Sequence, residues 1–284
     1  SLTTHPHPGD VTANVRKILS EYLACGIDPE KAAIYVQSDV KEVLELYLYL
    51  NMNAYLGELQ RVTSFKEKAR KQPENVNAGL LTYPTLMAAD ILIHRADKVP
   101  VGKDQEQNME MARKFARRFN TIYGVEFFPE PQSYSFGGDA IKVPGLDGSG
   151  KMGKSEGNAI YLIDDAATIR KKVMKAVTDS GPTQPNSEKP EAIANLFTML
   201  KIVSSADTYD YFNEKYNACE IRYGDLKKQL AEDIVNFTSP IRERILAYAA
   251  DTEYMDKVAR EGAEKARASA DKTIREVRKI IGFN

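Results

Sequence analysis

The chain has 284 residues with 39 basic and 40 acidic side chains, and the net charge of -1 excludes a broadly polybasic protein. Hydrophobic residues make up 43% of it, but no apolar run approaches the ~18 residues that a bilayer span requires, so no membrane association is expected. Cys25 and Cys219 are far apart and form no CxxC pair, which predicts a reducing, cytoplasmic setting and no zinc site. The segment that begins at Ser1 does not resemble a signal peptide and reads as the start of a trimmed chain.

The first two thirds of the chain alternate helix and strand signals. Apolar spacing predicts helices over residues 11–24, 40–55, 84–94 and 104–119, the third of them opened by Pro84. Short strands are predicted at 33–37 and 98–102, and 160–163 also reads as strand. Strands and helices in this alternation favour a doubly wound parallel α/β sheet, in which ligands bind at the carboxyl ends of the strands.

From Glu191 onward only helical patterns remain. They cover residues 193–203, 226–237, 241–249 and 254–280, with a break expected at Pro240. The stretch 180–185, Ser-Gly-Pro-Thr-Gln-Pro, is the best candidate for a linker. We therefore expect a catalytic α/β domain over residues 1–183 and an all-helical domain over 184–284.

A glycine-rich segment with two lysines lies at residues 145–155, Gly-Leu-Asp-Gly-Ser-Gly-Lys-Met-Gly-Lys-Ser. It formally matches the P-loop pattern, but a P-loop needs a strand before it and a helix after it, and neither is predicted. A second interpretation is a loop that closes over ATP, in which Lys151 and Lys154 neutralise a departing pyrophosphate. A third is a solvated basic turn.

The predicted helix after Pro84 carries a carboxylate on an otherwise apolar stripe. Counting from Tyr83, residues Met87, Asp90 and Ile91 follow at four, seven and eight positions, which places them on one face. A carboxylate there requires a partner. One interpretation is a salt bridge or cap to a neighbouring element. The other is that Asp90 accepts the N–H of an indole that packs on Met87 and Ile91, which would reject analogues without that donor.

The turn after the strand at 98–102 is the third constellation. Asp104 and Gln107 have the spacing of a capping box, which predicts Asp104 as the N-cap of the next helix. The same turn stands at a strand's carboxyl end, where a doubly wound sheet binds ligands. Both roles are compatible.

These three segments together resemble the class I aminoacyl-tRNA synthetases, and specifically the bacterial-type tryptophanyl-tRNA synthetases. Residues 151–155, Lys-Met-Gly-Lys-Ser, resemble the KMSKS loop with glycine in place of the middle serine. Residues 102–105 resemble the Gly-x-Asp-Gln motif, and 57–68 with 82–92 are similar to the tryptophan enzymes. The related tyrosyl enzymes typically have a glutamine where Met87 stands. The resemblance covers essentially the whole chain and implies a Rossmann-type catalytic domain followed by a helical anticodon-binding domain.

The resemblance also implies roles for individual residues. The catalytic lysines would be Lys68, Lys151 and Lys154. ATP, with Mg²⁺ carried by its phosphates, would be bound by Gly102, Asp104, Lys151, Met152, Lys154 and Ser155. Tryptophan would be bound by Tyr83, Met87, Asp90, Ile91 and Gln105, and no residue cluster offers a dedicated metal site. The implied partners are tRNA, gripped by the helical domain with Lys272, Arg275 and Lys279 on one helix face, and a second copy of the chain packed through Gly57–Phe65.

The HIGH-type motif and first strand of that family are not found in this sequence, and His94 does not replace them. Three alternatives therefore stay open. A tyrosyl-type synthetase would need a polar group at Met87, and a P-loop NTPase would need a strand and a helix around Gly148. A non-catalytic fragment that binds tryptophan or tRNA would share every feature described above.

Overall fold

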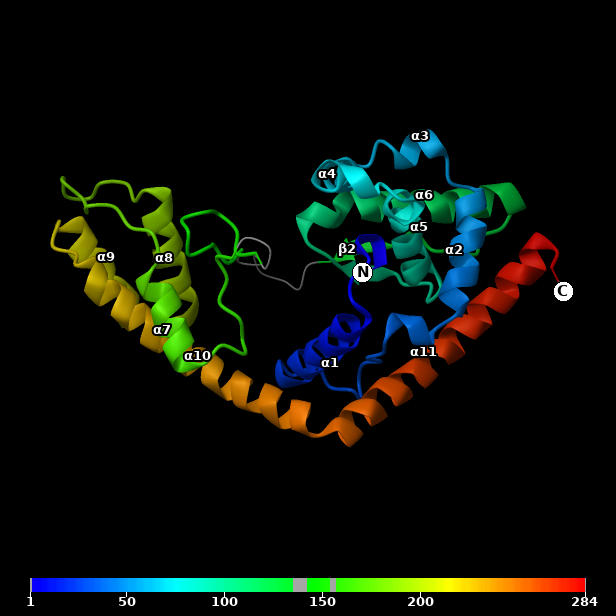
Figure 1. Ribbon diagram of the computed structural model, residues 1–284. Helices are drawn as coiled ribbons and strands as arrows, with labels where there is room; N and C mark the ends of the chain where they lie inside the picture. Colours follow the sequence, from blue (N-terminus) through cyan, green and yellow to red (C-terminus); the bar gives the residue numbers. More distant parts are fainter. Residues whose placement is uncertain (1, 135–141, 154–156, 284) are drawn as a thin grey trace. The chain divides into compact units, whose positions relative to one another are not determined.

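The computed structural model describes residues 2–134, 142–153 and 157–283. The chain divides into two compact units (Figure 1). Unit 1 comprises Ser1–Leu19, Ile27–Asp139 and Thr252–Asn284, and unit 2 comprises Ser20–Gly26 and Ala140–Asp251. The domain boundary expected at residues 183–184 and the candidate linker at 180–185 both fall inside unit 2.

Unit 1 is built around helix α5 (Ala78–Leu92), which contacts α2 (Glu42–Met52) and α6 (Glu106–Tyr123) (Figure 1). Its core consists of aliphatic and aromatic side chains of these helices, among them Leu46, Leu92 and Phe115. The other elements of this unit are η1 (Leu2–Thr4), η2 (Gln37–Asp39), α3 (Leu56–Leu59), α4 (Thr63–Lys71), η3 (Pro73–Asn75), η4 (Lys103–Gln105) and α11 (Thr252–Ile281), together with most of α1 (Pro8–Ala24).

A parallel strand pair lies in unit 1. β1 (Lys98–Pro100) pairs with β2 (Gln132–Tyr134), with Val99 opposite Ser133, and α6 connects the two strands. Parallel strands joined through a helix form the βαβ unit from which doubly wound sheets are built. The predicted strand at 98–102 is thus confirmed in a shorter form, and the helix predicted at 104–119 is found at Glu106–Tyr123.

The strand predicted at 33–37 is wrong. The backbone at Val36 is extended, but among the described residues this segment pairs with neither β1 nor β2, and η2 follows it. It lies instead against α11, where a Cβ atom on the buried Gly262 would be 1.9 Å from the carbonyl oxygen of Ile34. Only a glycine at 262 allows two backbones to approach this closely.

Two prolines lie inside helices that were predicted to begin or break at them. α5 starts before Pro84, at Ala78, because the side chain of Asn77 accepts a hydrogen bond from the backbone N–H of Leu80 and caps the helix. Helix α10 (Tyr223–Ala250) continues through Pro240. A proline forfeits one helical hydrogen bond, and in both cases the packing of the long helix on its neighbours outweighs that loss.

Unit 2 is helical in its described part. α7 (Ala166–Met174) and α8 (Glu191–Val203) pack on α10, and α9 (Ala206–Asn217) packs on α8 around a core that includes Phe197, Leu200 and Leu230 (Figure 1). The strand reading of residues 160–163 is wrong, since no strand forms there, and α7 and α9 were not predicted. None of the described helices is long and apolar enough to cross a bilayer.

Candidate active site

The helix face expected to hold the amino acid is formed by α5. Tyr83, Met87 and Asp90 are half-buried on it, and Ile91 is only 8% exposed. Met87 and Ile91 both pack into the core of unit 1. Asp90 is therefore a carboxylate beside apolar side chains, as the spacing predicted.

The partner of Asp90 is an amide and not a cation. The Gln37 Nε2 atom lies 2.8 Å from Oδ1 and 2.6 Å from Oδ2 of Asp90, so the amide donates to the carboxylate. Burial raises the pKa of Asp90, while the hydrogen bond from Gln37 lowers it. The salt bridge that was the alternative expectation for Asp90 is not formed within the described residues. Sequence reasoning missed Gln37, although it ends the extended segment, the place where α/β folds position ligand-binding groups.

The extended segment before Gln37 is held by a second polar contact. The Tyr35 hydroxyl and His94 Nε2 are 2.9 Å apart, and His94 Nδ1 lies 3.2 Å from the Ser269 hydroxyl on α11. Burial lowers the pKa of His94, which favours the neutral ring. His94 is thus a structural link between three segments of unit 1.

Tyr83 is the start of a polar chain that joins three of the expected site residues. Its hydroxyl is hydrogen-bonded to the Ser64 hydroxyl, and the Lys68 ammonium lies 4.0 Å from the centre of its ring. The Asn108 amide lies 3.4 Å from the Tyr83 hydroxyl and donates at 2.9 Å to Gln105 Oε1. This chain brings Lys68, Tyr83 and Gln105 together, as the sequence motifs suggested.

Asn108 was not predicted as part of this site. It is 3% exposed, and its own Oδ1 atom is buried without a hydrogen-bond partner among the described residues. A buried acceptor left without a donor is costly. Its signal in the sequence was a polar residue on the apolar face of α6, three positions after Gln105.

The turn at Asp104 differs from the expected capping box. Asp104 lies in η4, Gln105 occupies the N-cap position of α6 without a side-chain cap, and Gln107 Oε1 accepts instead from the backbone N–H of Thr63. Asp104 accepts a hydrogen bond from Gln105 Nε2 at 3.0 Å. A Cβ atom at Gly102 would be 2.6 Å from Asp104 Oδ1, so a glycine there leaves room for this carboxylate.

The first part of the lysine loop is organised by one buried amide in unit 2. The Asn158 side chain, 5% exposed, accepts from the backbone N–H of Gly153 and donates to Asp147, to Ser149 and to the carbonyl of Lys151, all at 2.9–3.1 Å. Ser149 and Asn158 together hold the pKa of Asp147 below its ordinary value.

Glycine is required where the loop folds over this amide. A Cβ atom at Gly145 would be 2.2 Å from Asn158 Nδ2, and Gly148 has a φ of 85° in the left-handed region. Asn195 of α8 donates to the carbonyls of Gly148 and Ser149 at 2.9 and 3.0 Å. Asn158, although only three residues after Ser155, was not predicted as a loop anchor.

Within this anchored loop Lys151 is exposed and Met152 packs against the core of unit 2. Lys154 and Ser155 lie outside the described residues. From 157 to the start of α7 at Ala166 the chain forms no helix, so the P-loop reading lacks its helix. Among the described residues, no three or more His, Cys, Asp or Glu side chains are grouped so as to hold a metal ion.

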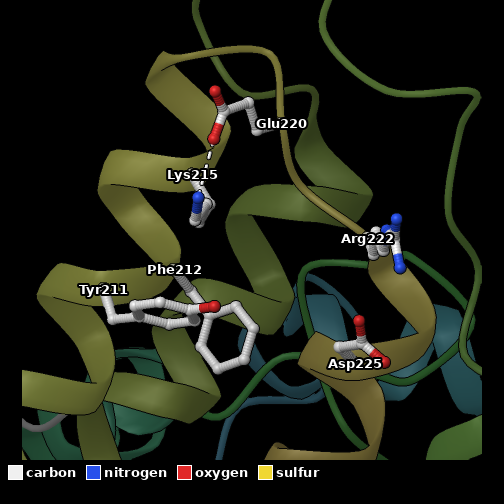
Figure 2. Close-up of a pocket in the computed structure, with 6 residues that line it drawn as sticks. All are labelled: Tyr211, Phe212, Lys215, Glu220, Arg222 and Asp225. Atoms are coloured by element: carbon white, nitrogen blue, oxygen red, sulfur yellow. Dashed lines mark hydrogen bonds and ion pairs between the residues drawn. The ribbon is translucent and has the colours of Figure 1, made fainter.

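Unit 2 also contains a groove of about 520 Å³ between α9 and α10. In Figure 2, Tyr211, Phe212 and Lys215 lie on α9 and face Arg222 and Asp225 at the start of α10. Tyr211 is 54% exposed, and Lys215 forms an ion pair with Glu220 at 2.7 Å. Within the described structure the Arg222 guanidinium has no hydrogen-bonded or ionic partner.

Comparisons with known proteins give one consistent result. The family model of the class I tRNA synthetases (W and Y) matches residues 2–239. The chain is 78% identical over 283 residues to a tryptophan–tRNA ligase of Porphyromonas gingivalis, which covers 100% of this chain and 86% of the relative. It is 41% identical over 272 residues to the tryptophan–tRNA ligase of Listeria monocytogenes, covering 94% of this chain and 80% of the relative.

The fold is also shared with solved structures. One is a tryptophanyl-tRNA synthetase from Campylobacter jejuni, complexed with ADP and tryptophan. The match covers 98% of this chain and 86% of the Campylobacter chain, with a TM-score of 0.85 and 33% sequence identity. The match to a tyrosyl-tRNA synthetase from Aeropyrum pernix covers 87% of this chain and 71% of the Aeropyrum chain, with 21% sequence identity and a TM-score of 0.59. At that identity the match shows a common fold alone. The expected Rossmann-type fold followed by a helical domain is thereby confirmed. The chain belongs to the class I tRNA synthetases for tryptophan and tyrosine, and within them to the bacterial-type tryptophanyl-tRNA synthetases.

Proposed function

We propose that the chain works as a tryptophan–tRNA ligase in which Asp90 recognises the indole N–H. The observation that carries this proposal is a half-buried carboxylate on α5, flanked by Met87 and the nearly buried Ile91. Apolar side chains beside one anionic acceptor fit an indole better than a phenol, because the indole N–H only donates, whereas a phenol hydroxyl also needs a donor. Tyr83 and Gln105 would bind the α-amino group, since the Asn108 link places them in one polar chain with Asp104.

ATP would be bound by the turn at the end of β1 and by lysines. Asp104 would accept hydrogen bonds from the ribose hydroxyls, and Gly102 gives its carboxylate room. Lys68, Lys151 and Lys154 would stabilise the charge of the triphosphate as the tryptophan carboxylate attacks the α-phosphorus and pyrophosphate leaves. Catalysis of this kind rests on positioning and charge neutralisation. Met152 and Ser155 would complete the loop over the nucleotide, and Mg²⁺ would arrive bound to ATP as part of the substrate.

A homodimer is proposed from an exposed apolar face in unit 1. Leu44, Leu48 and Met52 follow one another at intervals of four residues on α2 and are 51–74% exposed, and Tyr55 and Leu56 beside them are about as exposed. Such a contiguous apolar face is typical of an interaction surface. It directly precedes Gly57–Phe65, the region through which family resemblance suggests the dimer packs, and a two-fold axis would bury the face against its own copy.

For tRNA, the groove between α9 and α10 in unit 2 is a better-supported contact than α11 of unit 1. Tyr211 offers an exposed aromatic ring for stacking on an unpaired base, and the guanidinium of Arg222, which has no partner among the described residues, is suited to binding a phosphate. On α11, in contrast, Arg275 is paired with Asp271 and Lys279 with Glu276, which leaves those cations less available. We place the enzyme in the cytoplasm, where its exposed thiols Cys25 and Cys219 would stay reduced.

The decisive experiment is the tryptophan affinity of Asp90→Ala. The chain contains no tryptophan, so the fluorescence of added L-tryptophan reports binding without background. A hydrogen bond to a charged group contributes about 1.5–3 kcal/mol, so the Kd should rise roughly 10- to 150-fold. Asp97→Ala, which removes an exposed carboxylate of the same unit, is the control. Equal affinity for tryptophan in wild type and Asp90→Ala would refute the indole assignment.

A further inference from the structure

The contact between Gln37 and Asp90 joins two segments of unit 1 that are 53 residues apart in the chain. The amide nitrogen is 2.8 Å from one carboxylate oxygen and 2.6 Å from the other. A primary amide has two N–H groups, and each carboxylate oxygen has two lone pairs. Gln37 therefore uses only part of the hydrogen-bonding capacity of Asp90 and leaves acceptor positions for another donor.

Gln37 is fixed in this position by the extended segment before it. In extended backbone, residues two positions apart point to the same side, and Tyr35 and Gln37 contact His94 and Asp90, which lie just after and inside the last turns of α5. Tyr35 is hydrogen-bonded to His94 at 2.9 Å, and the neighbouring Ile34 carbonyl lies against Gly262 of α11. Gln37 itself is exposed, so a ligand can reach the carboxylate beside it.

We propose that Gln37 is a positioning residue for tryptophan recognition: its amide orients the Asp90 carboxylate so that a free lone pair points to the indole N–H. This inference rests on the proposed indole-binding role of Asp90. It assigns to Gln37 no contact with the reacting atoms. Its effect is on the choice of amino acid, through Asp90.

The electrostatics of the contact act in the same direction. Burial raises the pKa of Asp90 and the Gln37 hydrogen bond opposes this rise. The titratable groups of the adjoining segments are Tyr35, whose pKa is raised by burial and by the charge of Asp90, and His94, whose pKa is lowered by burial. Both are therefore neutral near pH 7, and no cation among the described contacts helps to keep Asp90 ionised. Removing the Gln37 amide should let Asp90 take up a proton at a higher pH, and a protonated carboxyl accepts hydrogen bonds less well.

The test compares wild type with Gln37→Met, which keeps the length of the side chain but removes the donor. Two quantities are measured from pH 5 to pH 8: the Kd of tryptophan, by fluorescence, and the Kd of its analogue with sulfur in place of the indole N–H, by competition. We expect Gln37→Met to raise the Kd of tryptophan about tenfold, because a single hydrogen bond is worth about that factor. The Kd of the analogue should change little, because the analogue has no N–H to donate to Asp90. Tryptophan affinity should fall as the pH is lowered and Asp90 is protonated, and in Gln37→Met this fall should occur at a higher pH than in wild type.

A second variant and a control make the result decisive. Gln37→Glu has the same size but places a second carboxyl against Asp90, so the pH midpoint should rise further than in Gln37→Met. Gln72→Met removes an amide that donates to the carbonyls of Thr3 and Asn75 in the same unit, and it should behave as wild type.

The outcomes separate this inference from the proposal beneath it. If Asp90→Ala abolishes the preference for tryptophan over the sulfur analogue while both Gln37 variants keep the wild-type preference and pH profile, the role of Gln37 is refuted and that of Asp90 stands. If Asp90→Ala also keeps the preference, the indole assignment itself fails.

Discussion

Asn158→Ala should separate catalysis from tryptophan binding, because this amide holds the lysine loop and lies in unit 2, whereas the expected tryptophan-binding residues lie in unit 1. Asn158 makes four hydrogen bonds, but its amide nitrogen has two hydrogens for three acceptors, which leaves about three bonds of ordinary strength. At about 1 kcal/mol each, their loss destabilises the anchored loop by about 3 kcal/mol, equivalent to a roughly 100-fold smaller population.

The assay is tryptophan-dependent ATP–pyrophosphate exchange, with tryptophan affinity measured separately by fluorescence. We expect kcat to fall by up to about 100-fold while the Kd of tryptophan stays within about twofold, the sign of an interaction used mainly in the transition state. Asn120→Ala is a matched control, since Asn120 also makes three hydrogen bonds, all to the backbone of Phe127 and Phe128. A wild-type kcat in Asn158→Ala, or an equal loss in both variants, would refute the reasoning.

Two further predictions test the proposed partners. Leu48→Asp places a charge in the exposed apolar face of α2 and should convert the dimer to a monomer in sedimentation experiments. Ile122→Asp, at a similarly exposed position on α6, should leave the dimer intact. A monomeric wild type would contradict the proposed dimer. Arg222→Ala should raise the KM for tRNA several-fold and reduce the salt dependence of tRNA binding by about one phosphate contact, with ATP–pyrophosphate exchange unchanged. If Arg275→Ala has the larger effect on tRNA, the contact lies on α11 and not in the groove.

The sequence allowed prediction of those parts of the site that repeat at a fixed period or follow a strand. Tyr83, Met87, Asp90 and Ile91 share a face because helical spacing dictates it, and α5, which begins at Ala78, contains all four. The turn at Gly102 could be placed because a short strand and an amphipathic helix flank it. Local pattern and tertiary structure agree at these positions.

Contacts between segments distant in the chain could not be predicted. Gln37 contacts Asp90 because the extended segment before it packs on α11, which lies more than 200 residues later in the chain. No local sequence pattern predicts such a contact. Pro240 does not break α10, since its helix is held by packing on α7 and α8. The partner of each amide, including Asn108 and Asn158, likewise depends on which elements meet.

The close approach of Ile34 to Gly262 also bears on how the protein matures during synthesis. Every residue assigned to tryptophan, and Gln37 with them, leaves the ribosome well before the segment Thr252–Asn284 that completes unit 1. The segment that carries Gln37, however, packs against the backbone of α11 at Gly262. Ser269 on the same helix contacts His94, which is hydrogen-bonded to Tyr35. Contacts of such long sequence separation form late in folding. The proposed tryptophan site is therefore finished only when α11 has been translated and docked, so a prematurely terminated chain would contain all of the residues proposed to bind tryptophan without a mature site.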